Sequence, residues 1–149
     1  MKKIVIASLI ALSAVSASAL EVGVTGSRDY AGIDRNGGGI TIGQTFGRFG
    51  ATTGIERFTQ GANDQTRYSL VGSYGVGSVG PVKAAVKGGV VYLDNQSGTD
   101  GAALVLGAGV EVPVNTKVSV TLDLTRQFGQ DRVNSFDGNK LTTGLKYKF

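Results

Sequence analysis

The C-terminal segment constrains the fold most, because it alternates between apolar and polar residues up to the last position. Leu141, Thr143, Leu145, Tyr147 and Phe149 fall on one face of an extended strand, and lysine, threonine or glycine lies between them. A soluble protein rarely leaves so apolar a strand at a terminus, where its edge would invite aggregation. A closed barrel whose outer face meets lipid requires this alternation. The segment therefore predicts a strand of a membrane barrel.

The N-terminal segment has the features of a secretory signal peptide. Lys2 and Lys3 precede an apolar stretch, and Ala17-Ser18-Ala19 supplies the small residues that favour cleavage after Ala19. The stretch is too short to span a bilayer as a helix, which disfavours a retained anchor. We expect residues 1–19 to be removed and residues 20–149 to form one exported domain.

Composition excludes several classes of function. Of the 15 basic residues, Lys2 and Lys3 lie in the leader, which leaves 13 against 11 acidic residues and no dense basic stripe for nucleic acid. The chain has no cysteine, so no disulfide framework supports it. The chain therefore lacks cysteine as a strong nucleophile, and because it also has no histidine it lacks the usual general base. We expect no enzyme activity, no metal site and no cofactor.

The mature chain contains eight segments with a period of two, which predicts an all-β, eight-stranded, antiparallel up-and-down transmembrane barrel. Short and long connections alternate between them, so both termini should lie on the periplasmic side. The expected strands cover residues 20–30, 38–47, 50–58, 67–77, 82–93, 102–112, 117–128 and 138–149.

The outward positions expected on these strands are apolar. They are Leu20, Val22, Val24, Ile40, Ile42, Phe46, Leu70, Tyr74, Val76, Val82, Val86, Val90, Tyr92, Leu104, Leu106, Val110, Val112, Val118, Val120, Leu122 and Leu124. A soluble β protein that binds an apolar ligand would show the same alternation with the faces reversed. The eleven aromatic residues, among them Tyr30, Phe58 and Phe136, fall near strand ends, which favours the girdles of a membrane barrel.

These features resemble the small eight-stranded outer-membrane barrels, a group that includes OmpX and the transmembrane domain of OmpA. The resemblance covers the mature chain and is sharpest in its last strand. In that family such a strand is the signal read by the barrel-assembly machinery, which implies this role for Leu141, Leu145, Tyr147 and Phe149. We expect no peptidoglycan-binding domain after the barrel, and the outer loops are short beside those of the adhesive members of the family. The resemblance implies a structural or surface-interaction protein of the cell outer membrane, and we expect a monomer.

The inward positions carry both signs of charge, and an eight-stranded barrel is just wide enough for side chains to fill it. Strand pairing should bring Glu111 near Lys83, and barrel closure should bring Glu21 near Lys146 or Lys148. An internal network of ion pairs is one interpretation. A narrow, gated diffusion pore whose pairs exchange is the alternative. The inward charged set is Glu21, Glu56, Lys83, Lys87, Glu111, Asp123, Lys146 and Lys148.

Arginines gather at the ends of the strands that lead into the long connections. Arg28, Arg57 and Arg126 also share the outward parity of their strands, with Arg35 and Arg132 nearby. Guanidinium groups suit phosphate, which the lipid A of lipopolysaccharide presents in the outer leaflet. The pattern predicts lipopolysaccharide contacts at this rim. Alternatively, the arginines are solvated or paired with Asp29, Asp34 and Asp131.

Overall fold

A computed structural model describes residues 20–30, 34–59, 64–95, 100–129 and 137–149. The expected signal peptide, Arg132, Asp131 and Phe136 lie outside these residues. Among the described residues, no helix is long and apolar enough to cross a membrane. In the part of the chain that the structure describes, all eight elements of secondary structure are strands, in agreement with the predicted fold class. They are β1 (Leu20–Asp29), β2 (Arg35–Phe46), β3 (Phe49–Thr59), β4 (Gln65–Val79), β5 (Val82–Asn95), β6 (Gly101–Pro113), β7 (Val118–Gly129) and β8 (Gly138–Lys148).

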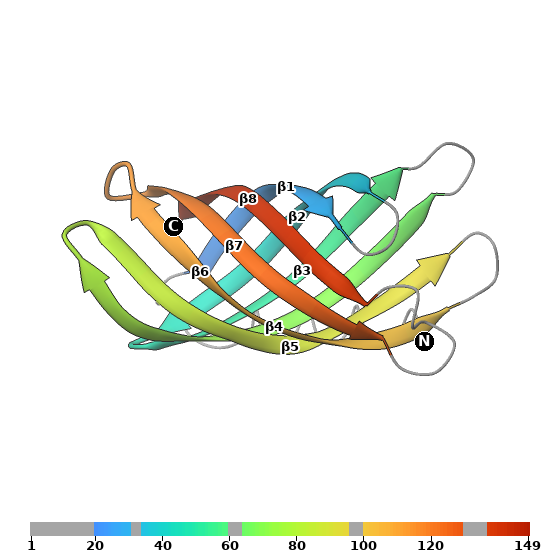
Figure 1. Cartoon of the computed structure of the whole chain (residues 1–149). Coiled ribbons are helices and arrows are strands. Elements are labelled where there is room, and N and C mark those ends of the chain that lie inside the picture. The colour runs from blue at the N-terminus through green and yellow to red at the C-terminus, as the bar shows by residue number, and fades with distance from the viewer. Residues whose placement is uncertain (1–19, 31–33, 60–63, 96–99, 130–136) are drawn as a thin grey trace.

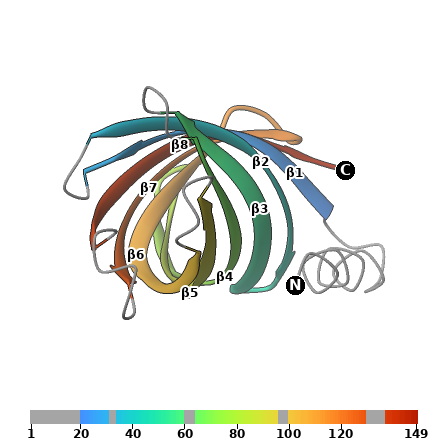
Figure 2. The ribbon, with the colours of Figure 1, turned by 90° about the vertical axis from the view of Figure 1, so that its right-hand side faces the viewer.

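Each strand pairs antiparallel with the next, and β8 pairs with β1 to close the barrel (Figures 1 and 2). Closure leaves no sheet edge, so the backbone groups of every strand find partners within the sheet. The register across the closing seam runs from Glu21 opposite Lys148 to Asp29 opposite Lys140. The backbone amide of Phe149 also donates to the Leu20 carbonyl at 3.0 Å, which ties the two ends of the described barrel together.

The tight turns and the C-terminus lie at one end of the barrel, which we call the turn end (Figure 1). Gly47 and Gly80 occupy two of these turns with φ of 61° and 58°. Glycine takes this left-handed conformation without the steric cost of a side chain. Strands β1, β3, β5 and β7 run toward the opposite end, which we call the loop end.

The outer wall is apolar and exposed, as the alternation predicts. Leu106 and Leu124 are each 58% exposed and Ile40 is 57% exposed, whereas the largest fully buried side chain, Arg67, faces the lumen. This inside-out distribution is that of a barrel whose outer wall meets hydrocarbon, and it excludes the reversed faces of a soluble β protein.

The aromatic residues follow the expected girdles with one correction. Phe46, Phe49 and Tyr74 are exposed near the turn end, and Tyr30 and Phe128 are exposed near the loop end. Phe58, expected in the outer girdle, is instead fully buried in the lumen. Its neighbour Arg57 takes the outward position, and the Phe58 ring lies over Gly37, where an added Cβ would approach the ring to 2.6 Å.

Candidate functional site: the lumen and the outer rim

Ion pairs line the half of the lumen nearest the turn end. The Lys146 ammonium lies 2.8 Å from a Glu21 carboxylate oxygen and 2.5 Å from one of Glu111, so it joins β8 to β1 and to β6. Lys83 is the register partner of Glu111, and Lys148 is the register partner of Glu21, but both lysines are exposed. Lys146 is therefore the lysine that the lumen uses to hold both carboxylates.

A second pair, Lys87 with Asp123, lies nearer the middle of the lumen at 2.6 Å. Gly109 is the register partner of Asp123, and a Cβ there would meet the carboxylate at 1.8 Å. Because residue 109 is glycine, the Asp123 carboxylate has room to lie against it.

Glu56 pairs with Lys140 at 2.6 Å and accepts a hydrogen bond from the Ser27 hydroxyl, also at 2.6 Å. Lys140 is a lumen residue that the predicted inward set lacks. The sequence does indicate its position, because Lys140 continues the inward parity of Lys146 and Gly144 along β8.

The loop end of the lumen is closed by a buried cluster that the sequence analysis missed. The Arg67 guanidinium pairs with Asp29 at 2.5 Å and donates hydrogen bonds to the Gln65 and Gln127 side-chain oxygens at 2.6 and 3.2 Å. It also stacks 4.0 Å from the Phe58 ring centroid. The side chains of Arg67 and Asp29 are 0% and 2% exposed. Asp29 is thus a lumen residue, not a partner of the outer arginines.

An apolar cluster lies beside Arg67 on the neighbouring strands of the same end. It consists of Val91, Leu93, Ala103 and Val105, all inward and buried. Leu93 is the register partner of Arg67, and Ala103 is that of Val91. Together with the Arg67 contacts, this cluster fills the described part of the lumen near the loop end, so the barrel is packed there.

The outer rim at the loop end carries exposed polar side chains on five consecutive strands. Arg57 on β3 is opposite Gly38, and Asn36 follows two positions away on the same face of β2. Asn36 is in turn opposite Arg28 on β1. Across the seam, Arg28 is opposite Leu141, whose next outward neighbour, Asn139, is opposite Arg126 on β7. We call Arg57, Asn36, Arg28, Asn139 and Arg126 the rim arc.

The three arginines of the rim arc differ in their partners. Arg28 pairs with Asp34 at 2.9 Å, and Arg57 pairs with Asp64. Arg126 stacks 5.5 Å from the ring centroid of Phe128, and within the described residues no carboxylate pairs with it. Arg35, the fourth described arginine of the expected set, begins β2 with the lumen-facing parity, so it does not share the outer face.

The four residues that are expected to serve in assembly are exposed or half-buried on the outer wall. They are Leu141, Leu145, Tyr147 and Phe149. The Tyr147 and Phe149 rings form an edge-to-face contact with centroids 4.9 Å apart, the geometry that aromatic pairs prefer. Leu145, Tyr147 and Phe149 thus follow one another on the outer face beside the closing seam, and Thr143 separates them from Leu141.

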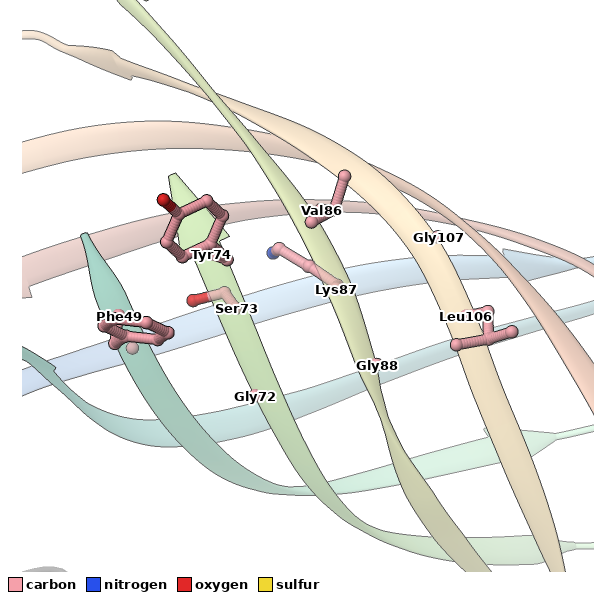
Figure 3. A pocket seen from close by; sticks show the side chains of 10 residues that line it. Phe49, Gly72, Ser73, Tyr74, Val86, Lys87, Gly88, Leu106 and Gly107 are labelled. Atoms are coloured by element: carbon pink, nitrogen blue, oxygen red, sulfur yellow. The ribbon is translucent and has the colours of Figure 1, made fainter. Parts of the chain in front are cut away.

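A shallow depression of about 550 Å³ interrupts the wall between β3 and β6 (Figure 3). Gly72 and Gly88 face each other across β4 and β5 there, and Tyr74, Val86 and Leu106 surround them. The outward side chains around it are apolar apart from the Tyr74 hydroxyl. The depression therefore suits hydrocarbon and brings together no groups for chemistry. The described residues also contain no cluster of metal-ligating side chains.

Solved structures resemble this barrel over almost its whole length. Neisserial surface protein A has a TM-score of 0.61 at 17% identity, covering 88% of this chain and 96% of that one. The Yersinia pestis outer membrane protein Ail, in a phospholipid bilayer nanodisc, has a TM-score of 0.59 at 10% identity, covering 89% and 100%. A de novo designed transmembrane β-barrel has a TM-score of 0.56 at 16% identity, covering 90% and 98%.

The chain has the fold of the small eight-stranded outer-membrane barrels. The identities are low, so the likeness concerns the arrangement of the strands. Comparison of the sequence with protein-family models and with curated proteins finds no match. A shared fold does not by itself define an activity. What this barrel does must therefore be argued from its own lumen and rim.

Proposed function

We propose that this protein is a non-catalytic, monomeric barrel of the bacterial outer membrane that binds lipopolysaccharide through its outer rim. The rim arc is the observation that carries the proposal. It places Arg57, Arg28 and Arg126 on alternate strands, with the amides of Asn36 and Asn139 on the strands between. Guanidinium and amide groups both donate hydrogen bonds to phosphate oxygens, and guanidinium does so in a bidentate fashion.

The position of the rim arc supports a lipid phosphate as its ligand. The arc lies directly beyond the apolar wall, at the end of the barrel that carries the longer connections. Such connections face outward in outer-membrane barrels. Phosphate groups attached to lipid chains would sit at this boundary between hydrocarbon and water. On the remaining strands, Tyr68 and Tyr92 are register partners on the outer wall and supply aromatic rings at the same boundary.

The packed lumen supports a structural or surface role in place of a diffusion pore. The Arg67 contacts and the apolar cluster fill the loop end, and ion pairs occupy the remainder. The ion pairs Arg67–Asp29, Lys140–Glu56, Lys87–Asp123 and Lys146 with Glu21 and Glu111 lie inside the barrel, where pairing stabilises charges that are shut away from bulk water. This arrangement offers no broad path for a solute.

The test is retention of lipopolysaccharide by the purified barrel after Arg28, Arg57 and Arg126 are together replaced by glutamine. We expect the triple variant to retain less than the wild type. Arg48→Gln is the matched control, because Arg48 is an exposed arginine in a turn at the opposite end. Unchanged retention in the triple variant, or an equal loss in the control, would contradict the proposal.

A further inference from the structure

Each of the four long connections ends in an aspartate immediately before the returning strand. These residues, which we call the loop-end aspartates, are Asp34, Asp64, Asp100 and Asp137. Asp34, Asp64 and Asp137 have contacts that reach back to the end of the preceding strand. Asp34 pairs with Arg28 and Asp64 with Arg57, while Asp137 accepts a hydrogen bond from the backbone amide of Gly129.

The loop-end aspartates divide the rim arginines into two kinds. A carboxylate already occupies the guanidinium groups of Arg28 and Arg57, in the place where a phosphate oxygen would bind. Arg126 lies on β7, and the connection after β7 ends in Asp137. The Asp137 carboxylate accepts its hydrogen bond from the backbone amide of Gly129. In the part of the chain that the structure describes, no carboxylate pairs with the Arg126 guanidinium group, and Asn139 lies directly across from Arg126.

Resting on the proposed function, we propose that Asp34 and Asp64 are built-in competitors of lipid phosphate for Arg28 and Arg57, and that Arg126 is the first arginine to bind it. A phosphate must displace a carboxylate at two of the three positions. The rim therefore binds phosphate in order, first at β7 and then at β1 and β3.

The two competitors differ in strength. Arg28 and Asp34 are both more than half exposed, whereas the side chain of Asp64 is only 26% exposed beside Arg57. Exposed ion pairs contribute little because water and salt screen them. Neutralising Asp64 should therefore raise the affinity of Arg57 for phosphate more than neutralising Asp34 raises that of Arg28. The range measured for exposed pairs corresponds to a change in affinity of roughly 1.4- to fivefold. Neutralising Asp64 should give a gain at Arg57 in the upper part of that range.

The experiment follows the side-chain Nε–H signals of the arginines by NMR, with the barrel in neutral phosphatidylcholine nanodiscs titrated with lipid A. Signals are assigned with Arg28→Gln, Arg57→Gln and Arg126→Gln. We expect the Arg126 signal to shift at the lowest lipid A fraction. We also expect Asp64→Asn to lower the midpoint for Arg57 by roughly two- to fivefold, and Asp34→Asn to lower that for Arg28 by less.

Asp94→Asn is the matched control, since Asp94 lies on β5 at the same end and makes no ion pair among the described residues. It removes the same charge without freeing an arginine. If Asp94→Asn lowers the midpoints as much as Asp64→Asn does, competition is refuted and general repulsion explains the effect. If inorganic phosphate produces the same shifts at the same concentration, the lipid source is refuted. If no arginine signal responds to lipid A, the proposed function itself fails.

Discussion

Replacing Asp29 by alanine should destabilise the barrel strongly, because it leaves the Arg67 guanidinium buried without its carboxylate. Both side chains are almost completely shut away from solvent, at 0% and 2% exposed. The other contacts of Arg67 include the neutral oxygens of Gln65 and Gln127 and the Phe58 ring. Removing one partner of a buried pair costs about 3–5 kcal/mol, so we expect a loss of that size in the free energy of unfolding.

The assay is equilibrium unfolding in urea with the barrel in lipid vesicles, with the folded fraction measured by gel mobility. The double variant Asp29→Ala with Arg67→Met is the informative control. Replacing both members of a buried pair by apolar groups is often close to neutral, so the double variant should recover most of the stability that the single variant loses. A loss below about 1 kcal/mol in the single variant, the scale of an exposed pair, would refute a dry and packed loop end.

Three further outcomes are expected. Leu122→Arg, on the exposed outer wall in the middle of β7, should cost about 2–4 kcal/mol by the same unfolding assay, whereas Asn139→Arg at the rim should cost less than about 1 kcal/mol; equal costs would contradict a lipid-facing wall. Phe149→Ser should reduce the amount of folded barrel in the outer membrane more than Phe46→Ser, measured on membrane fractions; equal reductions would argue against an assembly signal in the last strand. The purified barrel in a planar bilayer should show no steady ion conductance; a steady open channel would refute the closed lumen.

The strands and their faces could be predicted because lipid imposes a simple rule on a closed sheet. Outward residues such as Val24 and Leu122 must be apolar, and the strict period of two places their neighbours inside. Eight segments joined by alternating short and long connections then define the closed barrel. The pattern predicts the ends of the strands less closely than their faces: β4 extends from Gln65 to Val79, beyond the expected 67–77.

The interior could be predicted only in outline. Parity places Asp29, Arg67 and Lys140 inside, but which charges meet depends on the register across the closing seam and on the reach of each side chain. Phe58 was placed in the outer girdle because it lies at a strand end, although its parity with Glu56 is inward. Its burial follows from the empty face of Gly37 across the strand pair.

The rim shows what the pattern of residue types could and could not indicate. The outward parity of Arg28, Arg57 and Arg126 was readable, and the structure places them on one arc. Pairing of the rim arginines with Asp34 is the alternative to lipid contacts that the sequence suggests, and Asp34 does pair with Arg28. The aspartate that ends each long connection was visible in the sequence, but its relation to the preceding strand becomes clear only when both ends of the loop lie side by side.

The most direct test of the central claim is the gel mobility of the outer-membrane fraction with and without boiling in detergent. A closed barrel resists detergent until it is heated, so the unheated protein should migrate differently from the heated protein. Absence of a shift, with the protein recovered in the soluble fraction, would contradict a lipid-facing barrel and reverse the meaning of every outward residue.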